Sequence, residues 1–197
     1  MSFFCRLCVV LLVTIPPVCS RSAVASRIQT FLNGIKSMEA SFDQVDGPVA
    51  KTAKFYLRRS DGNLWVSVVY TSGPRQTVLV RNDDVSVFDK ETEKKYSFRI
   101  SQTPIFAVLS GKLDLSKEKY EVLEDSSELL RLKVIGSSVF GGVDVTLIFS
   151  KYPETGNIQK LIAWIIDNGT SEILVSFDPD SIRINDEIPE AVFTPPF

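Results

Sequence analysis

The pattern of apolar and polar residues predicts a helix at the start of the folded part of the chain. From Ser26 onward, apolar side chains recur at helical spacing and polar residues fill the opposite face. The apolar stripe consists of Ile28, Phe31, Leu32, Ile35 and Met38. Ser26 is a candidate N-cap. We expect this amphipathic helix to cover an apolar surface, because its apolar face must be buried.

After Phe42 the pattern changes to short runs of strand-forming residues separated by turn signals. The predicted strands are Ala53–Arg59, Leu64–Thr71, Gln76–Arg81, Val85–Asp89, Lys95–Ile100, Tyr120–Glu124, Leu129–Ile135, Val143–Ser150, Ile158–Asp167, Ser171–Phe177 and a last strand near Ala191–Thr194. Pairs such as Asp61-Gly62 and Asn168-Gly169 mark tight turns between them. An antiparallel sheet of this size must close, split or have its concave face covered.

One segment interrupts the strands and has the signals of a second helix. Pro104 precedes the apolar run Ile105–Leu109, and Gly111 follows it. Proline in a first turn and glycine after the last apolar residue are typical of helix ends. Such a helix would give the sheet a second cover. The alternative is a loop that packs its own apolar side chains.

Two predicted strands are apolar on both faces, which an antiparallel sheet with one solvated face does not require. In Leu161–Ile166 neither alternate set of residues is polar, and Leu64–Tyr70 is nearly the same. In a half-closed barrel, one side of such a strand would meet a helical cover or a ligand, and the other side would meet partner structure. A thick hydrophobic core is the other interpretation.

The N-terminus has the pattern of a secretory signal peptide. An apolar run, Leu7–Ile15, is broken by two prolines and followed by small residues that end at Ala25. The run is shorter than the roughly 20 residues that span a bilayer, which favours cleavage over a membrane anchor. We expect residues 1–25 to be a signal peptide, with Ser20 as a less well placed cleavage site, and residues 26–197 to form one exported domain. Lipid modification of Cys19 is a lesser alternative.

Composition then limits the chemistry of the exported part. The chain has no histidine, and its three cysteines, Cys5, Cys8 and Cys19, all lie in the leader. The usual nucleophile and base pairs, thiolate or imidazole metal sites and structural disulfides are thereby excluded from the mature chain. We therefore expect a binding protein with no catalytic residues, no metal and no cofactor.

Charge and the remaining carboxylates point the same way. Loss of Arg6 and Arg21 with the leader leaves 20 basic and 24 acidic residues, a net charge of −4, so nucleic acid is not an expected partner. A hydrolase would have to rely on carboxylates in predicted turns or solvated runs, where charge has an ordinary explanation. The best of these are Asp83, Asp84, Glu124, Asp125 and Asp167.

Several short segments, in order and spacing, resemble the periplasmic outer-membrane lipoprotein carrier (LolA) family over essentially the whole mature chain. The matching segments are Ala40-Ser41-Phe42-Asp43-Gln44, Leu57-Arg58-Arg59 with Trp65, Pro74 to Val80, Val87-Phe88-Asp89, Pro104 with Leu109, Leu161 to Gly169 with Ile173 and Phe177, and Phe193-Thr194-Pro195-Pro196. The resemblance implies an unclosed antiparallel β-barrel, mainly β, covered by an α lid from the N-terminal helix and the mid-chain helical segment.

The resemblance also implies a function and partners. Members of the family work in the periplasm, where they accept triacylated lipoproteins from an inner-membrane ABC transporter complex and deliver them to an outer-membrane lipoprotein receptor. The expected protein is a monomeric chaperone that shields the acyl chains of its cargo. A related periplasmic lipid-binding or envelope-sensing module of the same fold is the alternative.

Site residues follow from the matched positions. Arg59 matches the family arginine that hydrogen-bonds from the barrel to the lid, and it is the expected latch. Strand alternation then places Leu57 and Phe55 on the same side as Arg59. The expected lining of the cavity and lid is Leu32, Phe55, Leu57, Trp65, Ile105, Phe106 and Trp164.

The sequence departs from the family pattern at several positions. Ser60 stands where proline is common, Asn63 where an apolar residue often precedes the tryptophan, and Asp84 where a turn glycine is usual. Asn63 therefore changes how its strand would contact cargo or the transporter. The chain ends at Phe197, whereas some members continue with another element that favours one-way delivery.

Overall fold

The computed structural model describes residues 21–73, 75–100, 103–136 and 142–197. Most of the predicted leader and the matched Pro74 therefore lie outside the described residues. The helices are α1 (Arg21–Gly34), α2 (Pro104–Ser110) and the short 3-10 helix η2 (Glu190–Phe193). The strands are β1 (Ser37–Asp46), β2 (Val49–Ser60), β3 (Asn63–Tyr70), β4 (Gln76–Arg81), β5 (Asp84–Asp89), β6 (Lys94–Arg99), β7 (Tyr120–Asp125), β8 (Leu129–Val134), β9 (Asp144–Lys151), β10 (Ile158–Asp167), β11 (Glu172–Phe177) and β12 (Arg183–Ile184).

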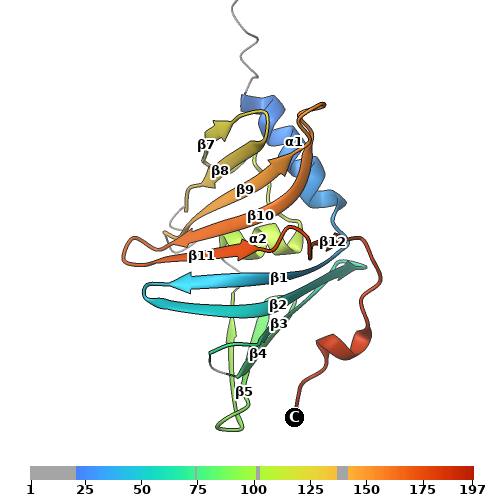
Figure 1. Ribbon diagram of the computed structural model, residues 1–197, viewed down its shortest axis with the longest axis vertical. Coiled ribbons are helices and arrows are strands. Elements are labelled where there is room, and N and C mark those ends of the chain that lie inside the picture. Colours follow the sequence, from blue (N-terminus) through green and yellow to red (C-terminus); the bar gives the residue numbers. More distant parts are fainter. Residues whose placement is uncertain (1–20, 74, 101–102, 137–141) are drawn as a thin grey trace, which may run out of the picture.

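The strands form one antiparallel sheet that does not close within the described residues. Its order is β6-β5-β4-β3-β2-β1-β11-β10-β9-β8-β7, and the short β12 pairs with β1 outside this path. β6 and β7 are therefore the two edges, although they follow each other in the chain with only α2 between them (Figure 1). The predicted unclosed antiparallel barrel is confirmed.

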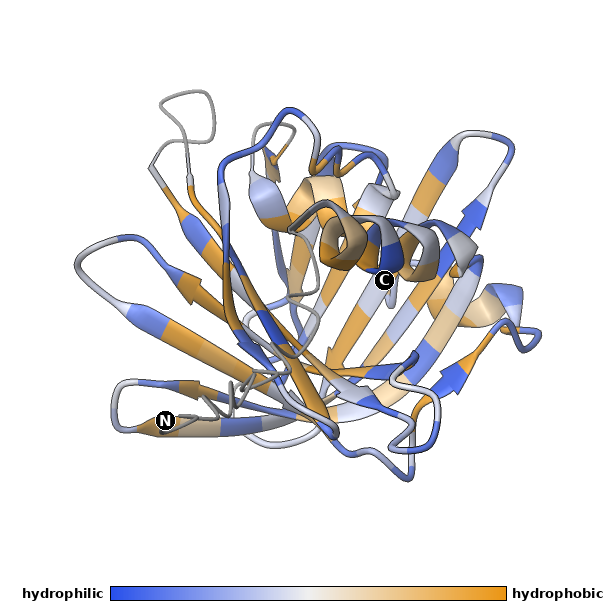
Figure 2. Ribbon diagram, turned by 90° about the horizontal axis from the view of Figure 1, so that it is seen from above, coloured by the Kyte–Doolittle hydropathy of each residue, from blue (hydrophilic) through white to orange (hydrophobic). Residues whose placement is uncertain are grey.

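The two helices cover the concave face of this sheet, which curves around them (Figure 2). α1 buries Val24, Ile28 and Leu32 in the core, and α2 buries Phe106 and Val108. Both predicted lid helices are present. Neither α-helix of the described residues is long and apolar enough to cross a membrane.

Local sequence explains the limits of α2. The Thr103 hydroxyl accepts a hydrogen bond from the Phe106 amide at 3.2 Å, which caps the helix, and Pro104 occupies the first turn, where its missing N–H costs nothing. Gly111 ends the helix with φ of 68°, a left-handed conformation that glycine adopts without strain. The start and stop signals in the sequence therefore predicted this helix correctly.

The predicted limits of the first helix were wrong at both ends. α1 begins at Arg21, five residues before Ser26, and ends at Gly34. Met38 therefore belongs to β1, in which alternate residues, not every third or fourth, are buried. Ile35 and Met38 lie beyond the end of α1 but are buried against the same core as the helix. Their apolar side chains therefore fitted the helical spacing although they are not helical.

β10 is apolar on both faces because a bulge changes its alternation. Leu161 pairs with Phe149, but Ala163 pairs with Ile148, so β10 has one extra residue between these two pairs. Leu161 and Trp164, three positions apart, both join the core cluster as a result. Because the bulge shifts the alternation by one residue, inward-facing positions fall in both alternate sets of β10, and both sets are therefore apolar.

β3 is apolar on both faces for a different reason. Its inner residues meet the core, and its outer face is covered by the C-terminal segment through η2. The predicted last strand near Ala191–Thr194 is wrong, since Glu190–Phe193 forms this 3-10 helix. Proline at position 189 and at positions 195 and 196 removes backbone donors on both sides of the segment, which disfavours strand pairing.

Candidate functional site

Arg59 joins the sheet to the C-terminal ends of both lid helices. From β2, its Nε donates to the Leu109 carbonyl at 2.6 Å and its Nη2 to Val108 at 2.7 Å. Its Nη1 donates to the carbonyls of Leu32 at 2.6 Å and Ile35 at 3.0 Å. One guanidinium thus bridges α1 and α2.

These acceptors are groups that a helix end leaves without partners. The last carbonyls of an α-helix have no intrahelical donor and carry the negative end of the helix dipole. Neither α1 nor α2 has a basic residue in its last turn. Arg59 therefore supplies the cation for both helices, and its planar fork of donors suits several carbonyls at once.

The charge of Arg59 is held by carbonyl dipoles. Burial lowers the pKa of Arg59 to about 10, so the guanidinium remains protonated at neutral pH. In the described part of the chain, the ion pairs do not include this arginine. Lid opening would hydrate the guanidinium without separating it from a counter-ion.

Gly111 brings the end of α2 close to this guanidinium. A Cβ at this position would lie 3.0 Å from Arg59 Nη1, and the φ of 68° is itself unfavourable for other residues. Glycine is therefore needed at position 111 both for the helix end and for the approach of Arg59.

Beneath Arg59, the space between lid and sheet is almost filled. A cavity of about 10 Å³ remains, roughly the size of one water-sized sphere. It is lined by Leu32, Ile35, Met38, Phe55, Leu57, Arg59, Val108, Leu109, Leu161 and Trp164. An acyl chain cannot fit in this closed form, and binding would require the lid to separate from the sheet.

Four of the expected lining residues meet at this cavity, namely Leu32, Phe55, Leu57 and Trp164. Trp164 stacks edge to face with Phe177, with ring centroids 4.8 Å apart, and with Phe55 at 5.8 Å. Such contacts stabilise aromatic pairs beyond their buried area. The bulge in β10 is what brings Trp164 inward.

Trp65 lies on the other face of the sheet, so its expected place in the cavity lining is corrected. In the β2–β3 pairing, Arg59 faces Leu64 while Arg58 faces Trp65, and successive side chains point to opposite faces. The Arg58 guanidinium lies 4.8 Å from the Trp65 ring and 4.8 Å from the Phe193 ring. Trp65 therefore packs under the C-terminal segment.

α2 holds both remaining expected residues. Phe106 is buried against the core, whereas Ile105 is partly exposed. Sequence reasoning missed Ile35, Met38, Val108, Leu109 and Leu161 as cavity residues. The apolar run before Gly111 was a usable signal for Val108 and Leu109, but the other three depend on the end of α1 and the bulge of β10.

A second, open pocket of about 600 Å³ lies beside the latch. Its lining is Arg59, Ser60, Asp61, Gly62, Asn63, Leu64, Asn82, Asp83, Phe106, Ser110 and Lys112. Asn63, a departure from the family pattern, accepts a hydrogen bond from the Asn82 amide at 3.4 Å. This pocket therefore has a polar rim next to the place where the lid meets the sheet.

Four of the five carboxylates considered for a hydrolase have partners that give them structural roles. Asp84 pairs with Arg99, and Asp125 pairs with Arg27 and Lys151. Asp167 accepts the Gly169 amide in the β10–β11 turn, and Glu124 accepts the Ser126 hydroxyl. In residues 21–73, 75–100, 103–136 and 142–197, no group of three or more acidic, histidine or cysteine side chains is placed to hold a metal.

Comparisons with models of protein families and with curated proteins find no match. Solved structures do match. A chain of the Pseudomonas aeruginosa MucA/MucB complex is 13% identical, with a TM-score of 0.51 over 88% of this chain and 60% of that chain. A crystal structure of MucB gives 13% identity and a TM-score of 0.53, over 88% of this chain and 62% of that one. This chain thus spans about three fifths of their length.

Mycobacterium tuberculosis lipoprotein LppX is similar over nearly its whole length. It is 16% identical, with a TM-score of 0.50 over 86% of this chain and 99% of LppX. Identities this low establish a common fold and leave function to be argued from the site. The comparisons therefore show a fold shared with MucB and LppX and do not assign the chain to the lipoprotein carrier family.

Proposed function

We propose that this protein is an exported carrier that accepts the acyl chains of triacylated lipoproteins from an inner-membrane ABC transporter complex and delivers them to an outer-membrane receptor. The observation that carries the proposal is the set of hydrogen bonds from Arg59 to the ends of both helices, whose buried faces cover the apolar concave side of the sheet. No covalent step is needed for such transfer, because the acyl chains move from one apolar environment to another.

The energies of cargo and latch are comparable. A hydrogen bond to a charged group contributes about 1.5–3 kcal/mol, so the four from Arg59 are worth about 8 kcal/mol together. Each buried methylene contributes about 0.8 kcal/mol. Measured against water, about ten buried methylenes offset the latch, which is fewer than one long acyl chain carries; in transfer from a membrane this gain is absent, and the ATP used by the transporter has to supply it. Cargo can open the lid, and closure of the latch helps to expel the cargo.

The leader and the composition also favour this function. An exported domain with a small negative net charge, without histidine or cysteine, has little material for catalysis and a large apolar interior. Exported lipid carriers need that interior and a means of release, and they need no reactive group.

A release assay tests the proposal. Membranes containing the transporter complex and a model triacylated lipoprotein are incubated with the purified protein and ATP. We expect ATP-dependent release of the lipoprotein in a soluble one-to-one complex, with no release when ATP or the protein is omitted. Tight binding of free phospholipid without any ATP-dependent release would instead favour the second candidate.

The second candidate is a periplasmic lipid-binding or envelope-sensing module of the same fold. It is favoured by the similarity to MucB, which is found in a complex with MucA. In that case the lid would report the presence of lipid to a partner protein, and the Arg59 latch would serve as the switch.

A further inference from the structure

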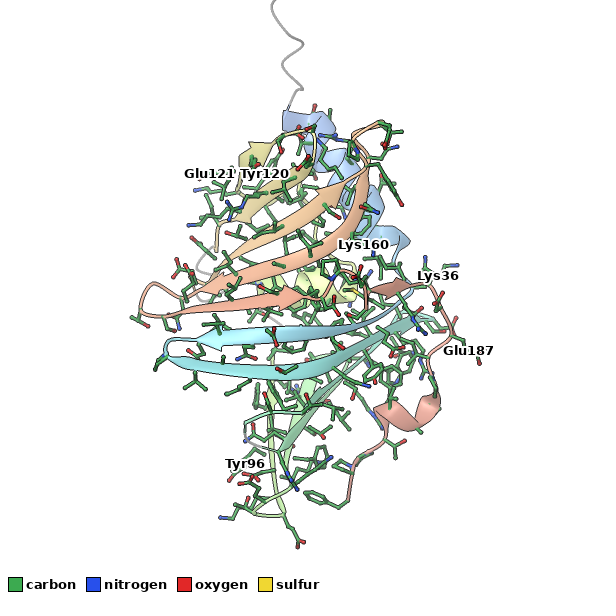
Figure 3. All side chains as sticks on the ribbon, in the orientation of Figure 1. Lys36, Tyr96, Tyr120, Glu121, Lys160 and Glu187 are labelled. Carbon is green, nitrogen blue, oxygen red and sulfur yellow. The ribbon has the colours of Figure 1, made fainter. Side chains whose placement is uncertain are left out.

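β6 is an open edge of the sheet with no covering segment among the described residues. All six of its residues are exposed, and its pairing partner is β5 on one side alone. Tyr96 marks its position at the end of the molecule away from α1 (Figure 3). The β5–β6 ladder is regular over its whole length, without a bulge. Unbulged exposed edges are templates for the addition of another strand.

The backbone groups that point off this edge can be assigned. The Ile100 amide donates to the Asp83 carbonyl at 3.0 Å, which marks a hydrogen-bonded pair. In an antiparallel ladder such pairs alternate. Tyr96 and Phe98 therefore direct their amides toward β5, and the amides and carbonyls of Lys95, Ser97 and Arg99 face away from the sheet.

The side chains of β6 divide into an apolar and a basic face. Tyr96 and Phe98 pair with Val87 and Val85 and continue the concave apolar surface, yet each is 53% exposed. Lys95 and Arg99 alternate with them and point to the convex side. A strand added at this edge would meet aromatic rings on one face and, on the other, Lys95 and Arg99, of which the exposed Arg99 also pairs with Asp84 of β5 at 3.1 Å.

We propose that β6 docks an extended segment of a partner protein by strand addition, with apolar residues on the segment's concave side and carboxylates on its convex side. Backbone hydrogen bonds to Lys95, Ser97 and Arg99 would hold the segment, and alternate side chains would select it. Opposite charges placed directly across a strand pair are favourable, which is the reason for an acidic segment. This inference does not depend on the nature of the cargo.

A second copy of this chain fits the edge poorly. Antiparallel pairing of two β6 strands centred on Ser97 would set Lys95 of each copy opposite Arg99 of the other, and like charges in that position repel. The other open edge of a second copy, the acidic β7, is also a poor partner for β6. β7 is bulged between Val122 and Glu124, and the bulge interrupts the regular hydrogen bonding of the strand. Its Asp125 is also already bound to Arg27 and Lys151.

An anionic bilayer is also a poor match. Residues 84–99 hold four cations and four carboxylates, so the β5–β6 hairpin has no net charge. Attraction to an anionic bilayer depends on the net charge of the protein surface that faces it. In a strand pair, by contrast, each side chain interacts with the one residue directly opposite, so individual charges matter. The distribution of charge therefore favours a peptide strand.

The test uses the purified protein and a capped hexapeptide of alternating valine and glutamate. Hydrogen exchange followed by NMR should show that the amides of Lys95, Ser97 and Arg99 exchange at least about tenfold more slowly with the peptide, equivalent to about 1.4 kcal/mol. The same peptide with lysine in place of glutamate should bind about tenfold more weakly or worse.

Two pairs of variants distinguish the contribution of backbone hydrogen bonds to peptide binding from that of side-chain charge. Ser97→Pro removes an edge-facing N–H and should abolish binding, while Ser97→Ala keeps that donor and should bind like the wild type. Lys95→Glu should weaken binding, and Lys36→Glu, which makes the same charge change at an exposed site far from β6 (Figure 3), should not.

Three results would overturn the proposal. The first is equal binding of the peptide by Ser97→Pro and the wild type. The second is slowed exchange of the same amides at high protein concentration without peptide, which would make a second copy the occupant. The third is binding to anionic phosphatidylglycerol vesicles with no binding of the acidic peptide.

Discussion

At the scale of single residues, one guanidinium binds the ends of both helices, and we propose that it holds the lid closed. Arg59 satisfies carbonyls at the ends of α1 and α2, and Gly111 leaves the space that this requires. Its neighbour Arg58 points to the other face and contacts Trp65, Phe193 and Glu190. Two consecutive arginines therefore have unrelated roles, and each provides a control for the other.

Arg59→Leu should still receive cargo but deliver it poorly. Without the latch, the closed form loses its hydrogen bonds while bound acyl chains keep their apolar surroundings, so the chains are retained. We expect delivery to receptor-containing membranes to fall about tenfold or more. Arg58→Leu, measured in the same assay, should deliver normally. Normal delivery by Arg59→Leu would remove this residue from the mechanism.

Gly111→Ala should open the lid without removing Arg59. The methyl group would lie 3.0 Å from Arg59 Nη1, and the left-handed φ adds about 1 kcal/mol of strain. Gly169→Ala is the matched control, because its φ is 81° but nothing lies within 4 Å of the added Cβ. Both variants should lower the midpoint of thermal unfolding, but only Gly111→Ala should speed hydrogen exchange in α2. Equal exchange in both would show that the contact with Arg59 is unimportant.

At the scale of elements, α1 is attached to the sheet more firmly than α2. Arg27 donates to Asp125 at 2.9 Å and to the Gly156 carbonyl at 3.1 Å, and the buried Lys151 donates to Asp125 at 2.7 Å. Gln29 donates to the Leu113 carbonyl in the segment after α2, so this bond links α1 to that segment and not to the sheet. These contacts hold α1 at its N-terminal half, whereas Arg59 holds its end. We therefore expect lid opening to move mainly α2.

Asp125→Asn should loosen α1 in a pH-dependent manner. Burial raises the pKa of the Asp125 carboxyl, but the hydrogen bond from Lys151 and the charge of Arg27 outweigh it and hold the pKa below its usual value. The stabilisation is therefore complete above the ordinary carboxyl pKa of about 3.9 and is lost as the pH falls through the lowered value.

At neutral pH we expect Asp125→Asn to lower the free energy of unfolding by about 2 kcal/mol, because Lys151 is left buried without its counter-ion. Urea unfolding across the pH range measures this difference, which should shrink as wild-type Asp125 becomes protonated. Asp167→Asn, in an exposed turn, should show a smaller change. A difference that persists unchanged in acid would exclude Asp125 as the titrating group.

The start of α1 leads to a prediction about processing. Val24 is 2% exposed and packs in the core, so cleavage after Ala25 would remove a core side chain, whereas cleavage after Ser20 would keep it. We expect mass spectrometry of the exported protein to find Arg21 as the first residue. A chain made from Ser26 should be less stable by about 1–2 kcal/mol, and a Ser26 terminus on the exported protein would contradict this prediction.

At the scale of the whole molecule, the closed form has an apolar interior but almost no free volume. The cavity of about 10 Å³ lies under the latch, and Trp164 lines it while Trp65 lies on the outer face. Under the proposed function, cargo would have to replace contacts between the lid and the sheet, because this cavity is too small to hold an acyl chain. The two tryptophans report on the inside and the outside of the barrel separately.

Single-tryptophan variants test this arrangement. With Trp65→Phe, the remaining Trp164 should be quenched by cargo whose acyl chains carry bromine, because quenching requires contact. With Trp164→Phe, the remaining Trp65 should be unaffected. Fluorescence titration of both variants with brominated and plain cargo makes the comparison. Quenching of Trp65 alone would place the cargo on the outer face.

The sequence by itself determined most of the elements and the overall class of fold, because strand alternation, turn residues and helix ends are local properties of the chain. It placed β2 to β11 to within a few residues of their observed limits, and it placed α2 with its glycine end. It also gave the common side of Phe55, Leu57 and Arg59, since alternation within one strand needs no partner.

The tertiary structure decided what depends on pairing between distant segments. The register of β2 with β3 put Trp65 outside, the bulge opposite β9 put Trp164 inside, and the C-terminal segment covered β3 in place of a partner. It also brought the ends of α1 and α2 to the same guanidinium. Such relations arise from the free energy of contacts between residues far apart in the chain, which no local pattern of apolar and polar residues encodes.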